Sequence, residues 1–217
     1  MNGGESTAGV AVLLFGGRRA PAPLRDLPAH PVDGEAGVDA IIGRSRRLVV
    51  IGGDADLATV LTRLLRADRL DVEVAYVPRR RTRATRVYRL PAGRRAARRA
   101  RKGRAHRVTL IRDETGSVVV GRASWAPVDG ELLLHGEAVI DDTTLFDGDV
   151  AAVHVEPTLV VPGLRASTSG LVRPWVAGRA AQLGSTGATV VRDGIPAPRP
   201  VRRSTFYRHV EGWLVVR

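Results

Sequence analysis

The sequence predicts an α/β N-terminal part, a parallel sheet with a glycine-rich turn, followed by an antiparallel β-rich, sandwich-like domain. Residues 46–77 alternate short apolar runs with a stretch of helical spacing, which is typical of a parallel crossover unit. From about residue 105, short alternating segments are separated by Gly and Asp turns, which favours an antiparallel sheet. We place the boundary inside a basic helix predicted over Gly93–Gly103, which divides the chain into 1–95 and 96–217.

Three apolar segments are predicted as strands of the parallel sheet. The first, Val10–Phe15, is a continuous apolar run suited to a strand that is buried on both faces. The second, 46–51, ends at a pair of glycines, and the third, 71–77, ends at Pro78. Parallel strands place their following loops at one edge of the sheet, so these loops are predicted to meet.

One amphipathic helix is predicted between the second and third strands. Its apolar residues fall on a single face and are Leu57, Val60, Leu61, Leu64 and Leu65. Residues 18–40 are rich in Pro, Gly, Asp and Ala without a clean period. We predict that they form a loop with at most one short helix.

The second half of the chain is predicted to contain seven strand segments. They are 107–112, 117–123, 131–140, 150–155, 158–161, 188–192 and 206–216. The predicted turns between strands are Glu114–Gly116, Asp129–Gly130, Asp147–Gly148 and Asp193–Gly194. No internal repeat is present.

Composition excludes several classes of protein. With 217 residues, 44% of them hydrophobic, the chain is long and apolar enough to bury a core. The absence of cysteine excludes a disulfide framework and a thiolate metal site. The apolar stretch Ala8–Gly17 is short and follows Glu5, unlike a signal peptide, and no apolar run approaches the length of a spanning helix. We therefore expect a cytoplasmic protein.

The net charge of +12 comes from one segment. Arg79–Arg107 contains 14 Arg or Lys residues and no Asp or Glu, whereas the rest of the chain has a net charge of −2. A block of this density attracts polyanions such as phosphorylated ligands, nucleic acid or an anionic membrane. The alternative is a solvated basic helix and loop without a partner.

The order of these segments resembles the diacylglycerol and lipid kinase family. Those kinases have a strand that ends in Gly-Gly-Asp-Gly-Thr, then an amphipathic helix, and then a strand that leads to a Gly-Thr-Gly-Asn-Asp turn. Val49-Val-Ile-Gly-Gly-Asp-Ala-Asp-Leu-Ala-Thr-Val60 resembles the first element, Val74–Pro78 the second strand, and Val87-Tyr-Arg-Leu-Pro91 the helix exit that follows. The resemblance implies the NAD kinase-like fold.

Further segments fall in the order of the family's β-domain strands: 107–112, 118–125, 146–153 and 190–194. The resemblance thus covers about residues 46–217. Residues 10–45 are too short for the family's opening region, so we expect at least one strand and one helix to be missing and describe 1–95 as a shortened domain.

Three departures from the family pattern fall at chemical positions. Ala55 and Asp56 replace the Gly and Thr of the first turn. Asp56 is predicted to be the N-cap of the following helix, where its carboxylate would repel a phosphate. At the second turn, the glycine-rich sequence is replaced by Arg79-Arg-Arg-Thr-Arg-Ala-Thr85, whose guanidinium groups still suit a phosphate.

The third departure concerns the base. The family's Asp-Gly-Glu supplies a glutamate that acts toward the lipid hydroxyl, whereas this sequence has Asp193-Gly194-Ile195, and isoleucine accepts no proton. The three departures together predict a pseudoenzyme with weak or absent phosphoryl transfer, to which we assign no catalytic residue. They also argue against an unchanged site for ATP and Mg²⁺, the cofactors that the resemblance implies.

Candidate site residues follow from the resemblance and from the charge. The resemblance assigns nucleotide binding to Gly52, Gly53, Asp54, Thr82 and Arg83. The basic block supplies candidate anion-binding residues, which are Arg79, Arg80, Arg81, Arg94, Arg95 and Arg98.

A cluster of aspartates suits Mg²⁺, because carboxylate oxygens are its usual ligands. Asp142, Asp147 and Asp149, with Asp141 beside them, are predicted to lie in one loop; the alternative is a solvated hairpin turn. The five histidines show no metal spacing, and His135 and His154 are predicted to be ordinary strand residues. The three tryptophans are predicted to pack in the core or at a sheet edge.

Two functions therefore remain open. The protein either binds a nucleotide or a phospholipid head group in a kinase-like cleft, or serves as a non-catalytic scaffold. In the second case the block 79–107 meets an anionic membrane at its inner face, nucleic acid or an acidic protein, and Tyr88 is the one aromatic residue in it. Base stacking is thus poorly provided for, so sequence-specific nucleic-acid recognition is not expected. The sequence also leaves open whether the protein forms a homodimer.

Overall fold

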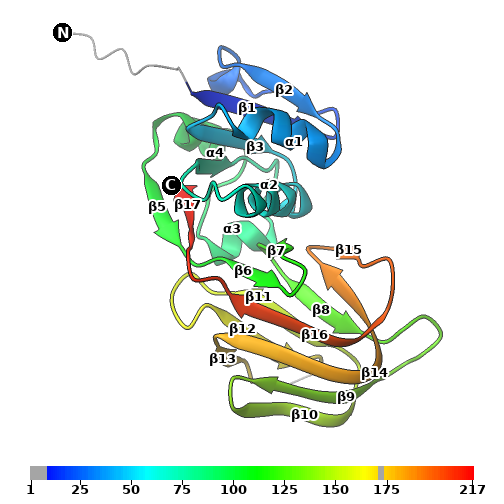
Figure 1. The fold of residues 1–217 in the computed structure, drawn as a ribbon. Helices are drawn as coiled ribbons and strands as arrows, with labels where there is room; N and C mark the ends of the chain where they lie inside the picture. The colour runs from blue at the N-terminus through cyan, green and yellow to red at the C-terminus, as the bar shows by residue number, and fades with distance from the viewer. Residues whose placement is uncertain (1–8, 171–173) are drawn as a thin grey trace. The chain divides into compact units, whose positions relative to one another are not determined.

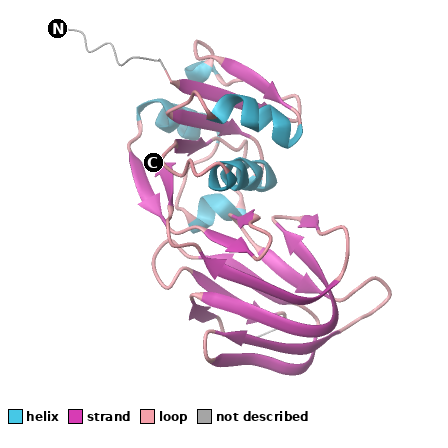
Figure 2. Ribbon diagram, in the orientation of Figure 1, coloured by secondary structure: helices cyan, strands magenta, loops and turns pink. Residues whose placement is uncertain are grey.

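The computed structural model describes residues 9–170 and 174–217, which form two compact units. The first unit comprises the chain up to Thr85, Arg89–Val108 and Trp213–Arg217, and the second comprises Arg86–Tyr88 and Thr109–Gly212. Figure 2 shows that helices accompany the sheet of the first unit, whereas the second is built of strands. The α/β part and the β-rich part predicted from the sequence are thus confirmed.

The first unit is built on a six-stranded sheet in the order β2-β1-β3-β4-β17-β5 (Figure 1). The strands from β2 to β17 run parallel to their neighbours, and β5 is antiparallel to β17. The predicted strands at 10–15, 46–51 and 71–77 are confirmed within one or two residues. The bounds are β1 (Val10–Phe15), β2 (Ala29–Val32), β3 (Arg47–Ile51), β4 (Glu73–Tyr76), β5 (Ala105–Val108) and β17 (Trp213–Val216).

Helices cover both faces of this sheet. The 3-10 helix η1 (Ala22–Leu24) and α4 (Gly93–Lys102) pack on the face that carries Val12, Val49 and Ala75. On the other face, α2 (Asp54–Arg66) packs beside α1 (Gly34–Ile42) and buries the predicted apolar stripe, with Leu65 at its half-buried margin. A short helix, α3 (Arg83–Val87), precedes the predicted exit segment Val87–Pro91 and shares only Val87 with it.

The region predicted as a loop contains a strand and a helix. Residues 18–40 hold η1, β2 and most of α1, so the prediction that they form a loop with at most one short helix is wrong. The expectation that the opening lacks a strand and a helix of the lipid kinases stays a prediction. Only Val32 is buried in β2, and only Val38 and Ile42 in α1. Because β2 is an edge strand, it tolerates Pro31 and shows no apolar run in the sequence.

The second unit is an eleven-stranded antiparallel sheet that folds around one core. Its main path is β13-β12-β11-β8-β14-β16-β6-β7, with β9, β10 and β15 attached. The bounds are β6 (Ile111–Asp113), β7 (Val118–Val119), β8 (Ala123–Ala126), β9 (Leu134–Ile140), β10 (Thr143–Val150), β11 (Val153–Pro157), β12 (Leu164–Thr168), β13 (Val176–Gly178), β14 (Ala180–Arg192), β15 (Ile195–Pro196) and β16 (Val201–Arg208).

The long strand β14 links the two halves of this sheet. Its first part pairs with β9 and β16, and its last four residues pair with β8. The bend between these parts lets the sheet enclose a core in which the rings of Trp125 and Phe206 lie 5.5 Å apart. Trp125 lies in this core, and Trp213 is buried in the first unit, as predicted. Trp175 is 38% exposed, with the Arg165 guanidinium over its ring.

Two predictions in the second unit are wrong. Residues 158–161 form a loop instead of a strand, with Val160 and Val161 both 67% exposed. Asp147–Gly148 lies inside β10, and the turn of that hairpin is at Asp141–Asp142. Apolar alternation without a sheet partner predicts a strand falsely, and an Asp-Gly pair is accommodated in β10 because Gly148 adopts a φ of 108°.

The boundary at residue 95 falls inside α4, which lies entirely in the first unit. The predicted segment 206–216 divides into β16 and β17, and β17 returns to the first sheet between β4 and β5. This return depends on a pairing between distant parts of the chain, which no local pattern reveals.

Within the described residues, no helix is long and apolar enough to cross a membrane.

Candidate functional site

The glycine-rich turn connects β3 to α2 at the carboxyl end of the parallel sheet. Gly53 is the N-cap and α2 begins at Asp54, so the prediction of Asp56 as the N-cap is wrong by three positions. The backbone N–H of Gly53 donates a 2.7 Å hydrogen bond to Asp56 Oδ2, and Arg18 Nη1 lies 3.3 Å from the same oxygen. Asp56 therefore closes the first turn of the helix from its third position.

Gly52 is a glycine because of this carboxylate. A Cβ added to Gly52 would lie 2.5 Å from Asp56 Oδ2 and 2.7 Å from Asp56 Cβ. A helix N-terminus attracts anions, because its free N–H groups and its dipole are positive there. Here the chain's own Asp56 carboxylate covers the turn, so a phosphate that entered the same place would meet a negative charge.

Asp54 connects the first turn to the segment that follows β4. The hydroxyl of Tyr76 donates to Asp54 Oδ1 at 2.8 Å, and the backbone N–H of Ala84 donates to Oδ2 at 3.2 Å. Burial raises the pKa of Tyr76, and the neighbouring Asp54 carboxylate raises it further. Both carboxylate oxygens of Asp54 therefore accept hydrogen bonds from the protein, which indicates a positioning role.

The arginine-rich second turn is closed by two threonines instead of glycines. The Thr82 N–H donates to the Thr85 hydroxyl oxygen at 2.8 Å, and the Thr85 N–H donates to the Thr82 hydroxyl oxygen at 3.2 Å. This reciprocal pair starts α3 and holds the loop without a residue in the left-handed region. Thr82 therefore shapes the loop, and sequence reasoning missed its partner Thr85.

An arginine pocket of about 360 Å³ lies at the carboxyl ends of β1, β3 and β4. Its floor is apolar and includes Ile51 and Val77, which are 5% and 4% exposed. Four guanidinium groups line it, and the residues described there include no carboxylate. The lining residues are Arg18, Arg19, Pro21, Ile51, Val77, Pro78, Arg79, Gly93 and Arg94.

Carboxyl ends of parallel strands are where α/β sheets bind ligands. Four guanidinium groups suit an anion that accepts several hydrogen bonds, and a phosphate is the group that does so best. The apolar floor suits the uncharged part of the same molecule. The arginine pocket therefore combines the features needed to bind a phosphorylated small molecule.

Known proteins resemble this chain in fold, although no family model and no curated protein matches its sequence. Among solved structures, a diacylglycerol kinase from Bacillus anthracis str. Sterne is similar, with a TM-score of 0.69 at 10% identity over 96% of this chain and 97% of that one.

Two nicotinamide-nucleotide kinases are also similar in structure. An NAD kinase from Archaeoglobus fulgidus in complex with ATP gives a TM-score of 0.64 at 12% identity, over 96% of this chain and 93% of that one. Yeast NADH kinase complexed with NADH gives a TM-score of 0.59 at 10% identity, over 98% of this chain and 84% of that one. The chain has the fold of diacylglycerol and NAD kinases. The resemblance inferred from motif order is thus confirmed at the level of the fold.

The structure separates the predicted site residues of this chain into four groups. Arg79 and Arg94 line the arginine pocket, whereas Arg95 and Arg98 line a second groove that is rich in cations. The turn residues Gly52, Gly53, Asp54 and Thr82 form the scaffold beside the arginine pocket. Arg80 and Arg81 on the loop and Arg83 at the start of α3 are exposed.

Sequence reasoning missed Arg18 and Arg19, which line the arginine pocket. They follow Gly16–Gly17 directly after β1, and both glycines have a positive φ. A glycine pair after an apolar strand, at the same sheet edge as the Gly52–Gly53 pair, is the signal that could have found them.

The aspartates predicted to hold Mg²⁺ do not come together. Asp142 lies at the β9–β10 turn, whereas Asp149 sits near the far end of β10 beside His135 Nδ1, at 2.9 Å. They are seven positions apart along extended chain, which corresponds to roughly 23 Å. Within the described residues, no group of three or more His, Asp or Glu side chains is arranged to hold a metal ion. These residues therefore do not fit a Mg²⁺ site.

Asp193–Gly194, the Asp-Gly motif that the sequence resemblance compared with the kinase base, is a hairpin turn. Asp193 and Gly194 have φ values of 47° and 89° between β14 and β15, and Ile195 is 59% exposed. The Asp193 carboxylate accepts hydrogen bonds of 2.7–3.0 Å from the N–H groups of Val120, Gly121 and Arg122. This carboxylate holds a loop, and Ile195 offers no proton acceptor.

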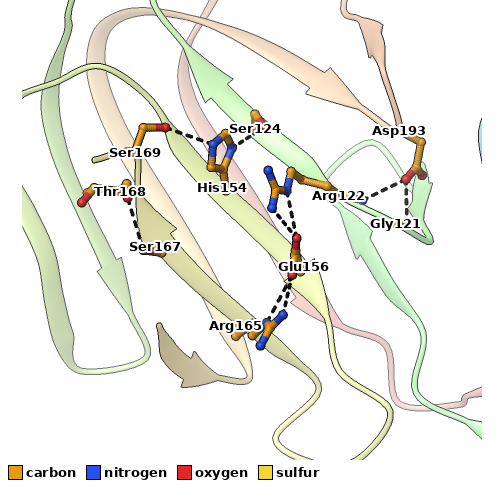
Figure 3. A network of polar contacts seen from close by, with 10 residues as sticks. All are labelled: Gly121, Arg122, Ser124, His154, Glu156, Arg165, Ser167, Thr168, Ser169 and Asp193. Atoms are coloured by element: carbon orange, nitrogen blue, oxygen red, sulfur yellow. Dashed lines mark hydrogen bonds and ion pairs between the residues drawn. The ribbon is translucent and has the colours of Figure 1, made fainter. Parts of the chain in front are cut away.

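A polar network ties β8, β11 and β12 together in the second unit (Figure 3). Glu156 accepts hydrogen bonds from Arg122 at 2.6 Å and from Arg165 at 2.7 Å. Burial opposes ionisation of Glu156, but the two guanidinium groups outweigh burial and lower the pKa of its carboxyl group below the usual range. His154 lies within hydrogen-bond distance of the hydroxyls of Ser124 and Ser169, so its contacts are those of a strand residue, as predicted.

Proposed function

We propose that this protein binds a nucleotide in the arginine pocket and transfers phosphoryl groups weakly or not at all. The observation that carries the proposal is the pocket itself, with four arginines over an apolar floor at the carboxyl ends of three parallel strands. The phosphates of the nucleotide contact the guanidinium groups, and its base or ribose packs on Ile51 and Val77. The ATP and NADH named with the two nucleotide kinases of this fold support a ligand of this class.

Weak transfer is supported by two turn residues of the first unit and by one motif of the second. Asp56 covers the first turn, and Asp54 is held by Tyr76 and Ala84. In the second unit, Ile195 follows the Asp-Gly pair at the position to which the resemblance assigns the base. Phosphoryl transfer needs positioned charge and a base, so these features together remove more from catalysis than from binding. No step of our proposal runs through Mg²⁺, because the described carboxylates do not fit a site for it.

Arg18 is the pocket residue for which a bound nucleotide and Asp56 would compete. Its guanidinium lines the pocket while Nη1 lies 3.3 Å from Asp56 Oδ2, and both side chains are partly exposed, at 43% and 30%. A surface pair of this kind is weak. A phosphate in the pocket therefore draws Arg18 away from Asp56 at little cost, which adds a fourth cation to the ligand.

Isothermal titration calorimetry with ATP, ADP and adenosine tests the proposal. We expect saturable binding of ATP and ADP and little binding of adenosine, because the arginines recognise phosphate. The double variant Arg79→Gln/Arg94→Gln should weaken ADP binding by at least tenfold, since a charge-assisted hydrogen bond contributes about 1.5–3 kcal/mol. The matched control Arg80→Gln/Arg81→Gln removes the same charge outside the pocket and should change the affinity by less than about threefold.

Two results would contradict the proposal. Absence of saturable binding by either nucleotide, or equal losses in the two double variants, would remove the arginine pocket as the site. Rapid phosphorylation of diacylglycerol or of NAD by the unmodified protein would leave the site intact but refute weak transfer. Both lipid and dinucleotide acceptors should therefore be assayed with the same preparation.

A further inference from the structure

A second concave surface of the first unit is lined almost entirely by cations. This basic groove has a volume of about 510 Å³, and its lining residues are Arg95, Arg98, Arg99, Lys102, Gly103, Arg104, His106 and Arg217. None of them lines the arginine pocket. Six side chains with a permanent positive charge thus share one groove, and the residues described along it include no Asp or Glu.

The two walls of the basic groove come from different elements. Arg95, Arg98, Arg99 and Lys102 follow the spacing i, i+3, i+4 and i+7 and form one stripe of α4. They point outward because the inner face of the helix consists of the buried residues Ala96, Ala97 and Ala100. The other wall is formed at the edge strand β5 and its neighbour β17. Arg104 precedes β5, His106 lies in it, and Arg217 follows β17.

The junction between the walls is held in place by Arg47. Its guanidinium donates to the carbonyl oxygens of Ala100 and Gly103 at 3.0 and 3.1 Å, while Nε donates to Glu73 at 2.6 Å. These bonds fix the end of α4 against the start of β5. Arg101, which points away from the groove, pairs with Asp26 at 2.6 Å. The helix is thus anchored on one side, and its other side is left to the basic groove.

Six like charges around one groove repel each other, and an anionic ligand relieves this repulsion. The stripe from Arg95 to Lys102 extends roughly 10 Å along the helix axis. Cations on both walls along such a length match a chain of negative charges better than a single compact anion. The chemistry of the groove therefore indicates a linear polyanion that lies along α4.

We propose that the basic groove binds the phosphodiester backbone of nucleic acid without reading its sequence. A phosphodiester backbone that lies along α4 contacts the cations of both walls. The groove also presents no apolar side chain for insertion into lipid among the described residues that line it. Cations on two walls suit the repeated charges of a phosphate backbone, so we assign the contacts to phosphates, which carry no sequence information.

Fluorescence anisotropy with a labelled duplex of random sequence tests this proposal. Titrations between about 50 and 200 mM salt give the number of phosphates neutralised, because the slope of log K against log[salt] is about −0.9 per contact. We expect a slope between about −3 and −5 and affinities that differ little between unrelated sequences. Duplex RNA should bind as well, since the contact is to the backbone.

The triple variant Arg98→Gln/Arg99→Gln/Lys102→Gln should weaken duplex binding at least tenfold and make the slope shallower by about 2 to 3. These side chains are exposed, so the variant should keep its circular dichroism spectrum and melting temperature. The control Arg80→Gln/Arg81→Gln/Arg86→Gln removes the same charge from exposed positions outside the groove and should retain most of the affinity and slope.

The proposal is overturned if both triple variants lose equal affinity, because net charge alone would then explain binding. It is also overturned if the unmodified protein binds phosphatidylglycerol vesicles at salt concentrations at which it binds no duplex. Nucleotide binding by the arginine pocket is measured separately with ADP, and the groove variant should leave the ADP affinity unchanged. Failure of one proposal therefore leaves the other testable.

Discussion

Arginines that line the pocket and the groove of the first unit have different neighbours from the core arginines of the second unit. In the second unit, Arg122 and Arg165 contact Glu156, which is 6% exposed, and Arg192 contacts Asp113, which is fully buried. The described residues that line the arginine pocket and the basic groove include no Asp or Glu. The same side chain therefore stabilises the fold in the core of the second unit and is available to a ligand in the pocket and the groove.

The role of each arginine depends on what its guanidinium contacts in the folded protein, and not on its position in the sequence. Removing one member of a buried ion pair leaves an uncompensated charge, which costs several kcal/mol. Removing an exposed arginine that faces solvent costs little, because water solvates it in both the folded and unfolded states. The comparison predicts large stability effects in the second unit and large binding effects in the first.

The largest stability effect is expected for Asp113→Ala. Asp113 Oδ1 accepts hydrogen bonds from the Thr115 N–H at 2.9 Å, the Thr115 hydroxyl at 2.7 Å and the Ser117 N–H at 2.9 Å, and its other oxygen contacts Arg192. Its loss leaves donors without acceptors and should lower the free energy of unfolding by about 3–5 kcal/mol. Urea unfolding measures this, with the exposed Asp129→Ala as the control. A loss below about 1 kcal/mol would contradict the contrast between the units.

A smaller effect, with a pH signature, is expected for Glu156→Gln. At neutral pH the variant should lose about 2–3 kcal/mol, because two guanidinium groups lose their carboxylate. The pKa of Glu156 is lowered in the folded protein, so its contribution is fully present above the unfolded value of about 4.3 and is lost as the pH falls through the folded pKa. The gap in unfolding free energy between wild type and variant should therefore narrow below about pH 4. An equal gap at pH 3 and pH 7 would mean that packing, and not charge, stabilises this network.

Gly52→Ala sharpens the comparison inside the first unit, where Asp56 is the carboxylate that covers the glycine turn. The new Cβ would overlap with the Asp56 side chain and should cost about 2 kcal/mol. The same change in an Asp56→Gly background should cost less than about 0.5 kcal/mol, because the three nearest atoms that the new Cβ would meet all belong to the Asp56 side chain and are then gone. A double-mutant cycle by thermal unfolding measures the coupling. Additive effects would show that Asp56 does not sit over Gly52.

The smallest stability effect is expected for Arg79→Gln/Arg94→Gln. These side chains line the arginine pocket and are exposed, so the free energy of unfolding should change by less than about 0.5 kcal/mol although nucleotide affinity falls. Chemical unfolding with and without ADP separates the two quantities. A large loss of stability in the absence of nucleotide would place these arginines with Arg122 and Arg192 as structural residues.

Local patterns predicted most of the first sheet and its central helix. The runs at β1, β3 and β4 are strongly apolar because these strands are buried on both faces, and α2 carries a regular stripe. By contrast, β2 is an edge strand with one buried residue, and α1 buries two, so neither pattern rises above its surroundings. Segments whose burial depends on a neighbour far along the chain are the ones that local periodicity misses.

The candidate site was predicted in part. Arg79 and Arg94 were found because the basic block is dense, and Gly52–Gly53 because a glycine pair follows an apolar strand. Arg18 and Arg19 were missed, since two arginines after a first strand carry no signal of their own. The aspartates proposed for Mg²⁺ were grouped because they are close in sequence, but β10 is extended and carries them apart.

The sequence by itself determined the order of α/β and β-rich parts, the glycine turn and the segment that carries the positive charge. These properties depend on residue type and on spacing over a few turns or strands. Only the tertiary structure decided that Asp56 covers Gly52, that β17 returns to the first sheet, and that the basic block divides between a pocket and a groove. Each of these depends on which distant segments the sheet brings side by side, and that choice is made by burial of the whole core.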